Sequence, residues 1–192
     1  RLHEKEAIMA ETVCALLRGI NVNGVAIRME ALRAAFAELG FPGAKTVLAT
    51  GNVVFSDAEH VGEAGLKRRV EAGLSARFAY GAHAFLRSKP EIDALLTAAE
   101  EIGVPEGCHL YALFFDVPEA ASELPELFAS APRLPGERLA VQGRDAFWTV
   151  PKGSTTDSAF GEKILGSRKY RTLTTSRNIN TVQKIAALMR VD

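Results

Sequence analysis

The feature that most constrains this chain is an order of secondary-structure signals that occurs twice. Apolar runs typical of buried strands alternate with segments whose apolar residues recur every three or four positions, as in an amphipathic helix. In the first half, strands are predicted at residues 13–20, 45–49, 52–56 and 82–86, with helices at 29–39 and 65–78. In the second half, strands are predicted at residues 109–116, 137–142, 146–150 and 170–175, with helices at 118–130 and 157–165.

This doubled order of strand, helix, two strands, helix and strand is the ferredoxin-like pattern. We therefore expect an α+β protein of two ferredoxin-like repeats, with antiparallel sheets and helices on one face of each sheet. A helix at residues 90–102 links the halves, and an additional helix at 180–189 closes the chain. The expected subdomains are residues 11–88 and residues 89–192, the second of which includes the linking and C-terminal helices.

The composition excludes several classes of protein. The 23 basic residues balance 23 acidic ones, so no global field attracts nucleic acid or an anionic membrane. No apolar run approaches the roughly 20 residues that span a bilayer, and the polar residues 1–9 do not resemble a signal peptide. Cys14 and Cys108 are too few for a disulfide scaffold, so we expect a reducing, cytoplasmic setting. The oligomeric state stays open.

The familiar motifs of cofactor and metal sites are missing from the sequence. Residues 19–24 have the glycine spacing of a phosphate loop, but Val25 and Ala26 replace the lysine and hydroxyl residue that contact phosphate and magnesium. The four histidines have no partners at ligand spacing, so we expect no zinc site. Cys14 lies in an apolar strand, where a thiol is inert. We predict no cofactor and no metal, and we leave open whether the protein is an enzyme.

Polar residues at the end of the first strand form one candidate site. Arg18 interrupts the apolar run, and a guanidinium there must be paired or must reach an edge of the sheet. In the ferredoxin-like topology the turn before the third strand lies at that edge, so Arg18, Asn21 and Asn23 would gather with Thr50 and Asn52. The alternative is that Arg18 pairs with an acid and that the asparagines only form turns.

A second candidate cluster lies near the end of the chain. Residues 152–184 contain seven basic and two acidic residues, whereas residues 91–128 contain nine acidic and no basic ones. Residues 174–181 lead into the last helix, whose N-terminus, with Arg177 beside it, would suit an anion. The alternative is a polar helix cap with solvated charges. The members of this cluster are Lys163, Arg168, Lys169, Arg171, Arg177, Asn178, Asn180 and Thr181.

Three segments, residues 16–24, 50–55 and 175–182, resemble the signature segments of the domain of unknown function 1697 family. The resemblance extends from about residue 11 to residue 190. It implies a mainly bacterial, soluble protein of two ferredoxin-like subdomains, and it implies no activity, because the family is named for lacking one. The family has Gly-Gly where this chain has Asn23 and Gly24. The residues that match the family pattern are Arg18, Gly19, Asn21, Gly51, Asn52, Arg177, Asn178 and Thr181.

Several functions of different class remain open from the sequence. We favour the binding of a small phosphorylated or carboxylated ligand in one polar cleft, because the positive charges are few and the acidic segment would repel a long polyanion. The alternatives are a nucleic-acid-binding module that uses residues 152–184, or a protein-interaction scaffold. Tyr111, Phe114 and Phe115 resemble an RNA-stacking platform, but that strand ends in Asp116 and core packing is favoured. The candidate ligand-binding residues are Arg18, Asn21, Thr50, Asn52, Lys163, Arg177, Asn178 and Thr181.

Overall fold

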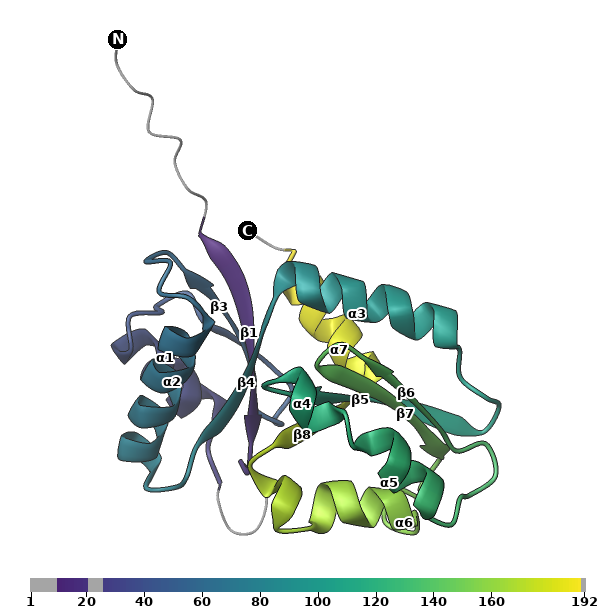
Figure 1. The fold of residues 1–192 in the computed structure, drawn as a ribbon. Helices are drawn as coiled ribbons and strands as arrows, with labels where there is room; N and C mark the ends of the chain where they lie inside the picture. The colour runs from purple at the N-terminus through teal and green to yellow at the C-terminus, as the bar shows by residue number, and fades with distance from the viewer. Residues whose placement is uncertain (1–9, 21–25, 191–192) are drawn as a thin grey trace.

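The structure is a computed structural model, and it describes residues 10–20 and 26–190. The first four strands form one antiparallel sheet in the order β2-β3-β1-β4. Two helices, α1 (Met29–Glu38) and α2 (Glu63–Phe78), cover one face of this sheet (Figure 1). The strands are β1 (Glu11–Arg18), β2 (Lys45–Val47), β3 (Asn52–Asp57) and β4 (His83–Ser88).

The second repeat has the same strand order. Its antiparallel sheet runs β6-β7-β5-β8, which matches the first sheet strand for strand. These strands are β5 (Cys108–Phe115), β6 (Arg138–Gln142), β7 (Asp145–Pro151) and β8 (Thr174–Asn178). Its helical segments are α4 (Pro118–Ala121), α5 (Leu124–Ser130), α6 (Ala159–Gly161), a π-helix (Glu162–Gly166) and a 3₁₀ turn (Lys169–Arg171). The prediction of two ferredoxin-like repeats is therefore confirmed.

Two further helices lie between the sheets and join the repeats (Figure 1). Helices α3 (Lys89–Ile102) and α7 (Ile179–Leu188) share one hydrophobic core with residues from both sheets, including Cys14 and Leu16 of β1 and Ala112 of β5. Both faces of each sheet are thus covered, whereas the sequence predicted helices on one face only. The apolar stripe of a single helix predicts that one side is buried, but it does not show that two sheets share that side.

The first repeat runs into the linking helix without a loop. Ser88 ends β4 and is also the N-cap of α3, and Pro90 occupies the first turn. The Glu91 carboxylate accepts hydrogen bonds from the Ser88 amide (2.8 Å) and the Ser88 hydroxyl (3.1 Å), and the first of these bonds is one half of a capping box. This rigid connection fixes the direction in which the second repeat begins.

The predicted strand at residues 170–175 is wrong in position. The strand β8 comprises Thr174–Asn178, and Tyr170 instead lies in a 3₁₀ turn with its ring in the hydrophobic core of the second repeat. A buried aromatic residue satisfies an apolar pattern in a turn as well as in a strand, which explains the error. The predicted helix at 118–130 is also divided into α4 and α5, because Pro125 lacks an amide donor and starts a new helix.

None of the described helices is long and apolar enough to cross a membrane.

Candidate anion site at the junction of the repeats

Polar residues from both repeats meet where β1 and β8 approach each other. The register of β1 on β3 places Leu16 opposite Asn52, so the end of β1 and the start of β3 lie together. Arg177, on β8, reaches across to this edge and donates to Asn52. The structure therefore brings Arg18, Thr50, Asn52 and Arg177 together, as the topology of the first repeat predicted for the first three.

Arg177 is 8% exposed, and its five N–H donors all have acceptors. The Nε donates to the Asn52 side chain at 2.5 Å, which ties β8 of the second repeat to β3 of the first. The remaining acceptors, at 2.7–3.1 Å, are the hydroxyl of Thr175 and the carbonyl groups of Leu17, Thr50 and Ser176. With all its donors engaged, this guanidinium holds the two repeats together.

All five acceptors of Arg177 are neutral, so its charge has no partner. Burial, with a further contribution from nearby Arg18, lowers the pKa of Arg177 to about 10, and the group is still a cation at neutral pH. Cys14 lies nearby, but burial raises the pKa of its thiol to about 12, so the thiol is neutral. Among the described residues Arg177 forms no ion pair.

Arg18 extends the positive charge from the junction towards solvent. Its Nη1 donates to the Thr174 carbonyl at 2.5 Å and its Nη2 donates to the Leu165 carbonyl at 3.2 Å, and both acceptors belong to the second repeat. Partial burial lowers the pKa of Arg18, and the nearby charge of Arg171 acts in the same direction. The alternative that Arg18 pairs with an acid is not observed, since no carboxylate in residues 10–20 or 26–190 forms an ion pair with it.

Asn52 supplies a neutral hydrogen-bond acceptor to Arg177 at the junction. It is fully buried, and its Nδ2 donates to the Val47 carbonyl (2.9 Å) and to the Thr50 hydroxyl (2.8 Å). These bonds direct its Oδ1 towards Arg177. Gly51, between Thr50 and Asn52, has φ of +77°, a left-handed conformation that favours glycine. The turn before β3 therefore presents the Thr50 carbonyl to Arg177.

The other predicted site residues that the structure describes form no hydrogen bond with this group. Asn178 is the N-cap of α7, and its side-chain oxygen accepts from the Asn180 amide at 3.0 Å, which agrees with the interpretation as a polar cap. Thr181 lies in the first turn of α7 and is partly buried. Lys163 lies on the π-helix and lines a pocket beside α5. Asn21 lies outside the described residues.

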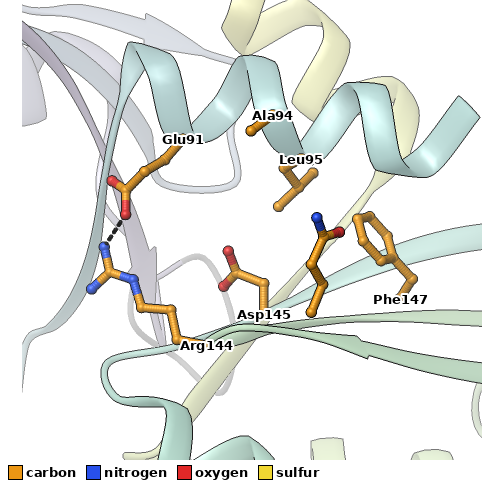
Figure 2. A pocket seen from close by; sticks show the side chains of 7 residues that line it. Glu91, Ala94, Leu95, Arg144, Asp145 and Phe147 are labelled. Carbon is orange, nitrogen blue, oxygen red and sulfur yellow. Dashed lines mark hydrogen bonds and ion pairs between the residues drawn. The ribbon is translucent and has the colours of Figure 1, made fainter.

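A second polar region joins the repeats on another side, and the sequence analysis missed it (Figure 2). Arg87 of β4 is fully buried, and it forms a two-point ion pair with Asp145 through Nη2 (2.5 Å) and Nε (3.1 Å). Arg144 binds Glu63 of α2 at 2.5 Å and Glu91 of α3 at 2.6 Å. Arg87 interrupts an apolar strand as Arg18 does, and this signal could have identified the region.

A cavity of about 200 Å³ lies beside this network, between α3 and the hairpin of β6 and β7 (Figure 2). Burial disfavours the Arg144 charge, but the hydrogen bonds to Glu63 and Glu91 outweigh burial and raise its pKa. Burial likewise disfavours the Glu91 charge, but bonds from Ser88 and Arg144 lower the pKa of Glu91 overall. Each arginine here is paired with at least one carboxylate, so this region is a clamp between the repeats. At the Arg177 junction, in contrast, no described carboxylate pairs with Arg18 or Arg177.

The described residues hold no group of three or more His, Cys, Asp or Glu side chains placed as metal ligands would be. Phe114 and Phe115 are fully buried and Tyr111 is partly buried. Because helices cover both faces of the sheet that carries them, these rings are packed in the protein interior. Core packing, the interpretation favoured from the sequence, is what the structure shows.

The fold and the junction define a class of protein: an α+β chain of two ferredoxin-like repeats that share a helical layer and bury arginines where they meet. The chain belongs to the DUF1697 family, described as proteins of unknown function, whose model matches residues 10–147. The match includes the first two signature segments, while β8 with Arg177 follows it.

A solved structure with a similar fold is that of the conserved bacterial protein SP0830 from Streptococcus pneumoniae. The TM-score is 0.73, at 22% sequence identity, over 95% of this chain and 100% of the other. This likeness extends the two-repeat fold over nearly the whole chain. A search among curated proteins gives no match to this sequence.

Proposed function

We propose that the junction of the repeats binds a small phosphorylated or carboxylated ligand, with Arg18 as the principal contact and Arg171 beside it. The observation that carries this proposal is that Arg18 and Arg177 lie together and no carboxylate among the described residues pairs with either. A charge withdrawn from water is costly unless it is paired. An anion from solution would supply the missing countercharge.

The residues of the junction take different parts in this proposal. Arg18 is half-buried, and two of its five donors bond to carbonyl groups of described residues, while the other three form no hydrogen bond within the described part of the chain. Arg177, with five bonds inside the protein, acts as a positioning residue that raises the local potential and fixes the carbonyl groups of Leu17, Thr50 and Ser176. Asn52 and Thr50 hold Arg177 in place. Arginine suits this task because its planar donors match the oxygens of phosphate and carboxylate.

Binding of inorganic phosphate tests the proposal in its simplest form. A ligand that binds only the folded state raises the melting temperature in a saturable way, so phosphate and a panel of phosphorylated and carboxylated metabolites would be titrated at constant ionic strength. Arg18→Ala should lose the saturable shift, whereas Arg68→Ala, which removes an exposed arginine of α2, should keep it. Equal responses from the two variants would refute the proposal.

Nucleic acid is the alternative partner, and the same protein discriminates it. Its affinity would fall steeply with salt, with a slope set by the number of phosphates neutralised, whereas one anion pocket has a shallow dependence. The basic stretch is partly neutralised, since Lys169 pairs with Glu123 at 2.6 Å. This pairing and the covered sheets favour the small ligand.

We also propose that residues 11–88 and 89–192 are the two subdomains and that the protein works in the cytoplasm. Each sheet is formed within one of these segments, which supports the division. Both cysteines are free and buried, as suits a reducing compartment. Because α3 and α7 complete the cores of both sheets, neither segment alone should be stable.

A further inference from the structure

A pocket of about 460 Å³ lies on the second repeat, and none of the junction residues Arg18, Asn52 and Arg177 lines it. One wall is α5, and the other is the segment that carries the π-helix and the 3₁₀ turn. Its volume falls in the range of small-molecule sites, roughly 300–1,000 Å³. The lining residues that carry the argument are Glu123, Glu126, Leu127, Lys163, Lys169 and Tyr170.

The charges of this pocket divide into a satisfied group and a free pair. The Glu123 carboxylate accepts from the Tyr170 hydroxyl at one oxygen and from the Lys169 ammonium at the other (2.6 Å). Glu126 and Lys163 are both exposed, and their side chains form no hydrogen bond or ion pair with any described residue. One free carboxylate and one free ammonium therefore line the pocket from its two walls.

The π-helix explains why Lys163 lies in the pocket wall. Ile164, the next residue, is fully buried in the core of the second repeat. Gly161, just before the π-helix, packs so closely that a Cβ there would meet the Thr155 carbonyl at 2.5 Å and the Trp148 ring at 2.7 Å. The π turn follows directly, with Ile164 in the core and Lys163 in the lining of the pocket. Such turns occur frequently at functional sites.

We infer that this pocket binds a small zwitterion of the amino-acid class. The ligand's carboxylate would bind the Lys163 ammonium, and its ammonium would bind the Glu126 carboxylate. Leu127 and the ring of Tyr170 also line the pocket and offer apolar surface to the ligand. A ligand with both charges gains two charge-assisted hydrogen bonds, whereas an analogue with one charge leaves a protein charge without a partner.

Three probes with one shared side chain test this inference: phenylalanine, its amide, which is only cationic, and N-acetylphenylalanine, which is only anionic. Each would be titrated into ¹⁵N-labelled protein and followed by amide NMR shifts. Phenylalanine should give saturable shifts at residues 124–130 and 162–170, and each analogue should bind about tenfold more weakly, as expected for the loss of one charged hydrogen bond. Equal binding by all three probes, or no saturable shift with phenylalanine, would overturn the inference.

Matched variants locate the two charges. Lys163→Gln and Glu126→Gln should each weaken phenylalanine binding by about tenfold, while Lys184→Gln and Glu119→Gln, at exposed positions on α7 and α4, should leave it unchanged. In Glu126→Gln the preference for phenylalanine over N-acetylphenylalanine should also disappear, which general destabilisation would not produce. Persistence of that preference would contradict the assignment of Glu126. Glu126→Gln should keep the saturable phosphate response assigned to Arg18, so this site and the junction are tested separately.

Discussion

Replacement of Arg177 by alanine measures how much the junction contributes to stability. The side chain donates five hydrogen bonds, of which those to Asn52, Thr175 and Leu17 are fully buried. At about 1–1.5 kcal/mol for each buried acceptor that loses its donor, Arg177→Ala should lower the free energy of unfolding by about 3–5 kcal/mol. With about 2–4 °C per kcal/mol for a chain of this size, the melting temperature should fall by roughly 6–20 °C.

The assay is equilibrium unfolding in urea, followed by two signals. Trp148 is the single tryptophan and is fully buried in the second repeat, so its fluorescence reports that repeat, while circular dichroism reports the whole chain. The two curves should coincide, because α3 and α7 place both sheets in one core. Arg68→Ala, on an exposed helix face, should change the free energy by less than about 0.5 kcal/mol. A loss below about 1 kcal/mol in Arg177→Ala would refute the reasoning that its five bonds stabilise the junction.

Three further perturbations test the rest of the structure. Asp145→Asn leaves the fully buried Arg87 without its countercharge and should cost about 3–5 kcal/mol in thermal unfolding; a neutral effect would mean that the ion pair is dispensable. The pKa of Glu91 lies below its ordinary value of 4.5 in the folded state, so its contribution to stability is present above that value and is lost as the pH falls through the lower folded pKa. The free energy of unfolding in urea would be measured between pH 6 and pH 3, an interval of about three units. It should decline less in Glu91→Gln than in the wild type, and an equal decline in both proteins would contradict this. Gly51→Ala, at φ of +77° and with a Cβ 2.7 Å from the Ile20 side chain, should cost at least about 1 kcal/mol, whereas Gly81→Ala, with nothing within 4 Å, should be nearly neutral; similar effects would show that the turn before β3 tolerates a Cβ.

The repeated fold could be predicted because its signal is local and periodic. A few residues suffice to indicate a strand at the apolar runs of β1 and β5. The same holds for a helix at the apolar stripes of α2 and α3. The sharing of α3 and α7 between two sheets could not be predicted, because it depends on contacts between segments far apart in sequence. The close packing of Gly161 against Trp148, just before the π-helix, likewise joins segments that are distant in sequence.

The candidate site was predictable only where topology alone decides contacts. The pairing of β1 with β3 follows from the ferredoxin-like order, and this pairing places Arg18 near Thr50 and Asn52. The position of Arg177 depends on how the second repeat docks, which no pattern in the sequence specifies. The sequence predicted Arg177 beside a helix N-terminus, as a direct anion contact. In the structure Arg177 lies in β8 and is buried, so it serves as a positioning residue.

The assignment of Arg18 to an anion site is tested most directly by its own Nε–Hε signal in NMR. Phosphate would be titrated against chloride at constant ionic strength, with the side-chain signals assigned through Arg18→Lys and Arg68→Lys. The Arg18 signal should shift and saturate, because its guanidinium meets the ligand, while the Arg68 signal should stay in place. An Arg18 signal that moves no more than that of Arg68 would contradict the assignment.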